Sequence, residues 1–217
     1  MQSINETAAL ESVADLCARL AEFGTPPKPV TRTIVQADTA GSSVRDAALE
    51  FAAKGWPVFP IYGARDGGCA CWRHAECKSP GKHPKTTHGV LDASTEPGVA
   101  AAMFQGQTAN VGVRTGVACD VLDVDAGGLE TLRALTGLEE IADIWTGPVA
   151  RTRSGYHLYL LPTGAGNAVK MRDGLDYRGR NGYVVAPPSI HVSGVRYEWL
   201  REGALLEAPI WLRGMLP

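Results

Sequence analysis

Three features of this sequence predict an α+β fold. Helical signals occur only before Pro148, in segments 6–22, 43–54, 95–105 and 128–137. From residue 149 onward, short β-rich segments alternate with Gly, Asn and Pro turn residues, as in an antiparallel meander. A hydrophobic fraction of 45% over 217 residues is sufficient for a packed core. The sequence therefore predicts helices and a mostly antiparallel sheet in one main domain.

Residues 1–42 are expected to form an arm in front of this domain. Segment 6–22 predicts an amphipathic helix, and the proline-rich GTPPKPVTRT at 24–33 predicts a linker, because proline lacks the amide donor that a helix needs. Ser43, with Asp46 three positions later, fits a capping box for a helix that Gly55 ends. The main domain is therefore expected to span residues 43–217.

The remaining elements follow in order along the chain. Strands are expected at WPVFPIY (56–62), NVGVRTG (110–116) and ACDVLDVD (118–125). Thr95 is expected to cap a helix that has Pro97 in its first turn and ends near Gln105. A helix at GLETLRALTG follows the third strand. The β-rich segments of the second half are VARTRS, GYHLYLLP, GLDYRG, GYVVAPPSIH and VRYEWL. The Pro187–Pro188 bond is a candidate for a cis peptide.

Composition excludes several classes of protein. A formal net charge of −2 argues against a protein that coats nucleic acid by bulk charge. There is no run of 18 apolar residues, so no membrane span is predicted. The first residues, MQSINETAALESV, lack the basic and apolar regions of a signal peptide, and a cytoplasmic location is expected. In a reducing compartment, clustered cysteines indicate metal ligands rather than disulfides.

Charge is unevenly distributed along the chain. Residues 100–146 contain two basic residues and seven acids, whereas residues 151–201 contain eight basic residues and three acids. If the two stretches fold together, a carboxylate cluster faces a cationic wall, which suits divalent metals that handle a polyanion. A mosaic of solvated surface charge is the alternative.

The strand DVLDVD carries the first candidate metal ligands. Asp123 and Asp125 lie two residues apart, so their carboxylates share one face of the strand, about 7 Å apart. Asp120 points to the opposite face and is not expected to join them. Magnesium commonly takes one or two protein carboxylates together with substrate phosphates. A polar strand end is the alternative interpretation of this pattern.

The second half adds a histidine and a third acid. His157 follows Ser154 and Gly155, where glycine permits close approach of the backbone, and Arg151 and Arg153 are suited to phosphate. Asp176 lies beside two further cations, Arg178 and Arg180, and either completes a metal site or is neutralised by them. Asp173, just before Gly174, is expected to be an ordinary turn residue.

A second ligand cluster lies in a loop at residues 69–84, CACWRHAECKSPGKHP. Cys69, Cys71, Cys77 and His83 form C-x-C-x5-C-x5-H, a Cys3His set of the kind that closes a structural zinc site. His74 and His88 are possible substitutes for His83, and free thiols in a loop are the alternative. Lys78, Lys82 and Lys85 either contact a nucleic-acid backbone or are solvated.

The other notable side chains are expected to pack rather than to react. Cys17 and Cys119 are interpreted as small buried or half-buried residues, and Trp56 and Trp199 as core anchors. Tyr156 and Tyr177 can stack on a base, but packing is the favoured interpretation.

These motifs, in this order, resemble the bifunctional DNA primase/polymerase N-terminal family of the archaeo-eukaryotic primase superfamily. The resemblance covers about residues 44–200 and rests on GWPVFPI, the cysteine loop ending in PGKHP, NVGVRTG with VLDVD, SGYHLYL, and LDYRGRNGYVVAPPSIHVSG-x-x-Y-x-W. It implies an α/β module paired with an RRM-like module. It also implies that Asp123, Asp125 and Asp176 bind catalytic metals and that His157 contacts nucleotide phosphates. Many relatives have SGG-x-H where this chain has S-G-Y-H, which leaves open whether Ser154 or Gly155 lies beside the nucleotide.

The predicted function is therefore template-directed DNA primase/polymerase activity by two-metal nucleotidyl transfer, in replication of the phage or plasmid type. The expected cofactors are catalytic Mg²⁺ or Mn²⁺ and structural Zn²⁺. The expected partners are single-stranded DNA template and primer, nucleoside triphosphates, and a replicative helicase on the same or another chain. His157 and one or more of Arg151, Arg153, Arg178 and Arg180 are expected to neutralise phosphate charge. A metal-dependent nuclease and a non-catalytic, zinc-bearing DNA-binding module are the alternatives.

Overall fold

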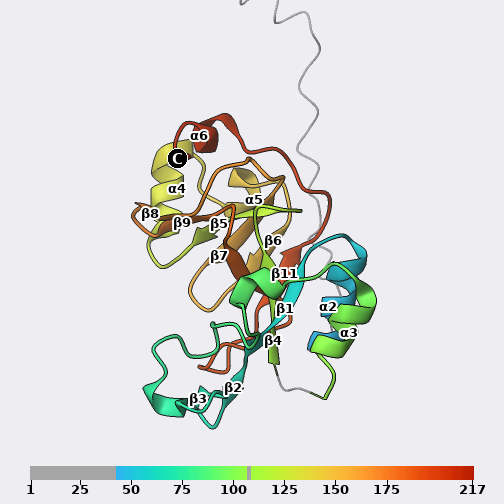
Figure 1. The fold of residues 1–217 in the computed structure, drawn as a ribbon. Coiled ribbons are helices and arrows are strands. Elements are labelled where there is room, and N and C mark those ends of the chain that lie inside the picture. Colours follow the sequence, from blue (N-terminus) through green and yellow to red (C-terminus); the bar gives the residue numbers. More distant parts are fainter. Residues whose placement is uncertain (1–42, 107–108) are drawn as a thin grey trace, which may run out of the picture. The chain divides into compact units, whose positions relative to one another are not determined.

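The computed structural model describes residues 43–106 and 109–217 (Figure 1). The predicted helix at 6–22, the linker at 24–33 and Cys17 lie outside the described residues. Within the described part, helices combine with antiparallel sheets, which confirms the α+β class. None of the described helices is both long enough and apolar enough to cross a membrane.

A three-stranded antiparallel sheet has the order β1-β4-β10, from Val58–Tyr62, Ala109–Arg114 and Tyr183–Ala186. Helices α2 (Val44–Ala53) and α3 (Pro97–Met103) lie together beside β1 and β4 (Figure 1). Phe51 and Phe104 of this helical layer share a core with Val111 of β4. A separate core cluster packs Phe59 and Ile61 of β1 with Val185 of β10 and with Tyr197, which follows β10.

A six-stranded sheet forms the second layer, in the order β11-β6-β7-β5-β9-β8. Its strands are β11 Glu198–Arg201, β6 Val149–Arg151, β7 Tyr156–Leu160, β5 Asp120–Val124, β9 Leu175–Arg178 and β8 Ala168–Arg172. All neighbouring pairs are antiparallel, as the meander predicted. One predicted β-rich segment of the second half, GYVVAPPSIH, does not join this sheet: its strand β10 pairs, also antiparallel, with β4 in the three-stranded sheet.

The two faces of β5 enter different environments. Val121 packs into the core that also contains α2 and α3, while Leu122 and Val124 enter a second core on the opposite face. That second core is closed by α4 (Gly128–Thr136), α5 (Ile141–Ile144) and α6 (Ile210–Arg213). Strand β5 is hydrogen-bonded to β7 on one edge and to β9 on the other, and both of its faces are packed. The backbone that carries its polar side chains is therefore fixed in position.

Helix starts agree with the sequence in one case and not in another. The capping box of α2 is confirmed: Ser43 Oγ accepts from the amide of Asp46 at 3.1 Å, and Asp46 accepts in return. The predicted cap of α3 by Thr95 is wrong, because Glu96 is the N-cap and no side-chain cap is formed. Pro97 is the first helical residue, and its preset backbone angle starts the helix without a cap.

The packing roles assigned to Trp56, Trp199, Tyr177 and Cys119 are confirmed. Trp56 stacks on Phe51 and Tyr159 with ring centroids 5.6 and 5.5 Å apart, and Trp199 closes the same group. Cys119 is fully buried. Tyr177 is also fully buried, within the second core. The Pro187–Pro188 peptide is cis.

The cysteine-rich loop between β1 and α3 contains little regular structure. It holds a two-residue hairpin, β2 (Ala64–Arg65) with β3 (Gly68–Cys69), and two 3₁₀ turns, η1 (His74–Glu76) and η2 (Gly89–Asp92). These short elements, together with β8, α5 and α6, are not evident from the sequence.

Candidate active site and metal centres

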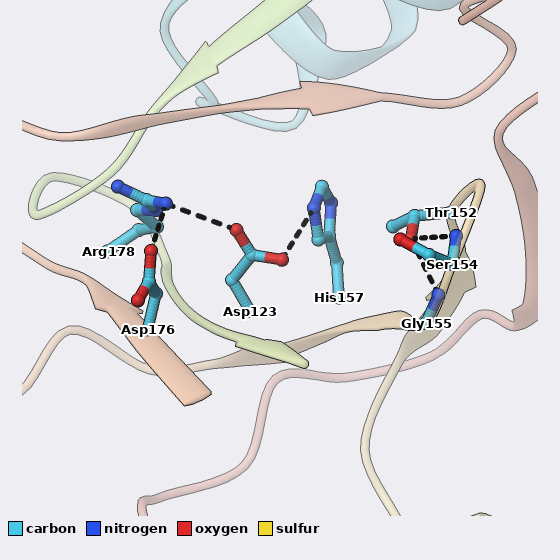
Figure 2. Close-up of polar contacts among 7 residues, drawn as sticks. All are labelled: Asp123, Thr152, Ser154, Gly155, His157, Asp176 and Arg178. Carbon is cyan, nitrogen blue, oxygen red and sulfur yellow. Dashed lines mark hydrogen bonds and ion pairs between the residues drawn. The ribbon is translucent and has the colours of Figure 1, made fainter. Parts of the chain in front are cut away.

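Sheet register brings the predicted catalytic residues into one row. Asp123 on β5 lies directly opposite His157 on β7 and directly opposite Asp176 on β9. Directly opposed residues of antiparallel strands project from the same face of a sheet. Figure 2 shows the result, with Asp123 between His157 on one side and Asp176 on the other.

His157 and Arg178 both contact Asp123. His157 Nε2 lies 3.3 Å from Asp123 Oδ1, and Arg178 Nη2 lies 3.3 Å from Asp123 Oδ2 (Figure 2). The same Arg178 nitrogen donates to Asp176 Oδ2 at 2.6 Å. Asp176 Oδ1 accepts from the amide of Lys170 at 2.6 Å. The row is therefore held by backbone register and by a continuous chain of polar contacts.

The two aspartates of the D-x-D pair have opposite pKa shifts. Burial raises the pKa of Asp123, but the charges of His157 and Arg178 outweigh it, and the net shift is downward. The pKa of Asp125 is raised by partial burial and by the charge of Asp123, although the charge of Lys82 opposes this rise. Asp125 therefore carries an electrostatic penalty that a bound cation relieves.

The donor set fits a divalent metal. Asp123, Asp125 and Asp176 each offer a carboxylate oxygen, and these oxygens lie within 4.8 Å of one another. Oxygen donors clustered in this way suit Mg²⁺ or Mn²⁺. Asp120 is excluded as predicted: it is fully buried on the opposite face, where it accepts from Tyr177 Oη at 2.7 Å and from the amide of Thr163 at 2.8 Å.

A cavity of about 280 Å³ opens over this cluster. Its walls combine the carboxylates Asp123 and Asp125 with the cations Lys82, Arg153 and Arg178. The predicted layout of acids facing cations is present here. The other lining residues are Thr152, Ser154, His157, Asn167, Asn181, Gly182, Tyr183, Val184, Val185 and Tyr197.

A tight turn at residues 152–155 forms one rim of the cavity. Thr152 Oγ1 accepts from the amides of Ser154 and Gly155, at 3.4 and 3.1 Å (Figure 2). A Cβ placed on Gly155 would lie 1.8 Å from the carbonyl oxygen of Val124, so only glycine permits the turn to pass the end of β5. Ser154 lines both the cavity and a neighbouring groove of about 440 Å³, whereas Gly155 lines only the groove.

The four arginines assigned to phosphate occupy different places. Arg153 and Arg178 line the cavity. Arg151 lines the neighbouring groove and pairs with Glu198. Arg180 is exposed and lines neither space, while its amide donates to the carbonyl of Ala165 at 2.8 Å. The cavity therefore contains two of the four.

The Cys3His set is also assembled. The ligand atoms of Cys69, Cys71, Cys77 and His83 lie within 4.8 Å of one another, and Cys69 Sγ lies 3.3 Å from His83 Nε2. In a tetrahedral zinc site with bonds of about 2.0–2.3 Å, neighbouring ligand atoms are about 3.5–3.8 Å apart. The spacing and the sulfur-rich donor set therefore fit a soft divalent metal such as zinc.

The positions of the other histidines support this set, whereas the thiols differ from one another: burial raises the pKa of Cys77. The pKa of Cys71 is lowered to about 6, because hydrogen bonds from the Arg73 amide, His83 and the other two thiols outweigh the rise caused by desolvation. His74 Nε2 lies 3.0 Å from the carbonyl of Arg65, and His88 Nδ1 lies 2.9 Å from Asp92 Oδ1. Both are engaged elsewhere, so His83 is the histidine of the cluster.

Several cavity residues were not singled out in the sequence as site residues. Thr152 left a local signal, since a threonine two residues before Ser-Gly is typical of a side-chain-capped turn. Tyr197 belongs to the Y-x-W end of the family motif but was given no role: its ring lies 6.0 Å from that of His157, and it reaches the site from the segment between β10 and β11. Asn167 and Asn181 likewise enter from turns that only the tertiary fold brings to the cavity.

The fold and the site define a class: an α+β protein with a sheet-borne carboxylate cluster able to hold divalent cations beneath a cation-lined cavity. The family model for the N-terminal domain of bifunctional DNA primase/polymerase matches residues 48–211. That match covers most of the chain, which therefore belongs to this family. No curated protein matches the chain in a sequence comparison.

Proposed function

We propose that residues 43–217 form a catalytic unit that transfers nucleotides from nucleoside triphosphates to a DNA primer under the direction of a template. The observation that carries this proposal is the row Asp176–Asp123–His157, with Asp125 beside it, beneath a cavity lined by cations. In a chain of the primase/polymerase family, that arrangement is suited to a triphosphate and its divalent metals.

Asp123, Asp125 and Asp176 are the ligands that hold the catalytic Mg²⁺ or Mn²⁺. Such cations, when bound, supply Lewis acidity that lowers the pKa of a primer 3′-hydroxyl and neutralises charge on a departing pyrophosphate. The sheet positions the three carboxylates before any ligand arrives, because β5 is paired on both edges. Preorganisation of this kind removes a reorganisation cost from the reaction.

The neighbouring side chains bind and orient the nucleotide. Arg153 and Arg178 line the cavity as phosphate ligands, and Ser154 presents its hydroxyl at the rim. His157 orients Asp123 through its Nε2 contact and contributes positive charge when protonated. Arg151 and Arg180, which lie outside the cavity, are assigned to the path of the DNA backbone instead.

The two sheets and the Cys3His cluster are assigned as follows. The α2–α3 layer with its sheet corresponds to the α/β module of a primase-polymerase fold, and the six-stranded sheet to the RRM-like module. Zn²⁺ is assigned to the Cys3His cluster as a structural ion, since four protein ligands leave no open position. A replicative helicase partner and a phage or plasmid context stay predictions.

Primer extension on single-stranded DNA tests the function. A labelled primer on a longer template is incubated with deoxy- or ribonucleoside triphosphates and Mg²⁺ or Mn²⁺. The wild-type chain is expected to lengthen the primer, and Asp123→Asn and Asp176→Asn are each expected to lose more than about 100-fold in rate with an unchanged fold. Asp173→Asn is the matched control, an exposed carboxylate in the turn before β9 that lies outside the ligand cluster.

The same assay separates the alternatives. Shortening of the DNA without triphosphates indicates a metal-dependent nuclease. DNA binding that survives loss of all three aspartates, with no incorporation by the wild type, indicates a non-catalytic module. Undiminished extension by Asp123→Asn would overturn the assignment of the site.

A further inference from the structure

The Cys/His loop returns to the catalytic cavity at a single residue. Lys82 lines the cavity together with Asp123 and Asp125, and the next residue, His83, belongs to the Cys3His cluster. The two other lysines of the loop, Lys78 and Lys85, are not among the cavity residues. Adjacent side chains in the chain therefore serve the two ligand clusters.

The backbone around Lys82 is tied to β4 and to β10, and Tyr183, Val184 and Val185 of β10 line the cavity. The carbonyl of Gly81 accepts from Asn110 Nδ2 of β4 at 3.1 Å, and the carbonyl of Lys82 accepts from Tyr183 Oη of β10 at 3.0 Å. Asn110 is itself buried and also bonds to both backbone groups of Ile190. The segment thus has a built anchor on the cavity side.

Gly81 gives this segment its sharp course. Its φ of +70° lies in the left-handed region, and a Cβ there would come within 3.1 Å of Val192 Cγ1. Glycine therefore allows the chain to turn from the cluster into the cavity within one residue.

A second anchor lies on the cluster side. His83 Nε2 is 3.3 Å from Cys69 Sγ, and the His83 ring packs against Tyr62 with centroids 4.6 Å apart. The carbonyl of His83 accepts from the amide of Tyr62 at 3.0 Å. Lys82 is therefore held between the ligand cluster on one side and the strands of the cavity on the other.

The ion pairs of the cavity do not involve Lys82, so its ammonium group can bind a ligand. Arg178 is engaged by Asp123 and Asp176, whereas Lys82 and Arg153 form no ion pair within the described residues. An ammonium group on the wall of a cavity that also holds a carboxylate cluster is suited to a polyphosphate that arrives with its cations.

We propose that Lys82 binds the triphosphate of the incoming nucleotide, and that metal bound by the Cys3His cluster fixes Lys82 in that position and so controls nucleotide affinity. This inference rests on the proposed function of the cavity. The loop would then be part of the nucleotide-binding site rather than a separate structural zinc site. Phosphates of the primer or template share the same chemistry, and the test has an arm for each source.

Binding without turnover tests the first half of the proposal. The dissociation constant of a fluorescent nucleoside triphosphate is measured by anisotropy in Mg²⁺ without DNA, and that of a labelled primer–template is measured separately. Lys82→Ala is expected to weaken triphosphate binding about 10-fold, because a charge-assisted contact is lost, while Lys82→Arg stays within about threefold of the wild type. Lys85→Ala is the matched control, since its ammonium lies 5.7 Å over the Tyr62 ring and outside the cavity.

A double-variant cycle tests the coupling. Cys77→Ser is expected to lower bound zinc and to weaken triphosphate binding by a similar factor. If the metal acts through Lys82, the pair Cys77→Ser with Lys82→Ala binds no more weakly than either single variant. Hydrogen exchange of β5, β7 and β9 serves as the folding control, and removal of metal from the wild type by a chelator repeats the comparison without a substitution.

Each outcome decides between the proposals. Unchanged triphosphate affinity in Lys82→Ala overturns the phosphate role, and a loss confined to primer–template assigns Lys82 to DNA instead. Multiplicative losses in the double variant overturn the coupling alone. If the wild-type chain binds no triphosphate and extends no primer, the proposed function is wrong, and this inference is wrong with it.

Discussion

The two ligand clusters of this protein are built on opposite kinds of chain segment. The carboxylates project from β5, from its end and from β9, which are paired along their length within a six-stranded sheet. The Cys3His ligands come from one stretch, residues 69–83, whose regular structure is the last residue of β3 and a single 3₁₀ turn, η1. One cluster is held by a sheet, and the other by a loop.

This difference indicates which of the two sites needs a bound metal to keep its structure. A sheet keeps its side chains in register through backbone hydrogen bonds, so the carboxylates stay together without a cation. A loop with few internal bonds loses entropy when it is ordered, and metal binding commonly supplies the compensating free energy. Loss of metal is therefore expected to abolish catalysis at the sheet and to abolish structure in the loop.

Removal of a loop ligand has the largest expected effect on structure. Cys77→Ser is expected to lower bound zinc from about one equivalent to near zero, because three ligands hold the ion far more weakly than four. Backbone amides of residues 69–84 should then exchange with solvent more than about 100-fold faster, while those of β5 and β7 keep their protection. Metal analysis and hydrogen exchange measure the two effects.

The matched control is Cys119→Ala, which removes a buried thiol outside the cluster and should leave zinc content unchanged. If the loop keeps its protection after complete loss of metal, the contrast between the two clusters fails.

A direct challenge to the sheet-borne cluster is Gly155→Ala. The new Cβ would overlap the carbonyl oxygen of Val124 at 1.8 Å, so the turn must move away from the end of β5. We expect a loss of about 2–4 kcal/mol in the free energy of unfolding, measured by denaturant titration. Gly98→Ala, in a helix and with open space around the added carbon, should be neutral or slightly stabilising. Equal stability of the two variants would contradict the close approach.

The contrast between the clusters also explains what the sequence could predict. The Cys3His ligands are neighbours in the chain, so their spacing identified them, and the turn at Pro80-Gly81 favoured His83 over His74 and His88. The shared face of Asp123 and Asp125 followed from the two-residue period of a strand. The position of Asp176 opposite Asp123 is a matter of register between strands far apart in sequence, and only the resemblance to a family indicated it.

Other features had no local signal at all. Strand β10 was expected in the same meander as its neighbours, yet its pairing with β4 depends on which sheet edge is free. Thr95 is a better intrinsic cap than Glu96, but the backbone at Glu96 is the one that leads into Pro97. The entry of Lys82 into the cavity depends on bonds from Asn110 and Tyr183, which lie on two other strands.

The opposite face of β5 offers a test of intermediate size. Asp120 accepts hydrogen bonds from Tyr177, and from the amide and hydroxyl of Thr163, all on the buried side of the sheet. Asp120→Ala leaves the Thr163 amide without this acceptor and leaves the Thr163 and Tyr177 hydroxyls, which lie 2.8 Å apart, with only each other. We expect a loss of about 1–3 kcal/mol in the free energy of unfolding. Asp173→Ala, on an exposed carboxylate, should change stability by less than about 0.5 kcal/mol. A variant at Asp120 as stable as the wild type would show that the polar network does not hold this face.

The smallest expected effect concerns Asp125 in the metal-free protein. Its pKa is raised above the ordinary 3.8 by partial burial and by the charge of Asp123. Ionisation of Asp125 therefore destabilises the folded protein, and this destabilisation develops as the pH rises through the raised pKa. Asp125→Asn is therefore expected to raise the melting temperature slightly near pH 7 in a chelator that removes divalent cations. Near pH 3, below the ordinary carboxyl pKa, Asp125 is protonated in both the folded and the unfolded chain, and the difference should vanish. Excess Mg²⁺ should reverse the order at neutral pH, because the wild type then gains a ligand that the variant lacks. A stabilising effect that is independent of pH would mean that side-chain packing, rather than repulsion within the carboxylate cluster, separates the two proteins.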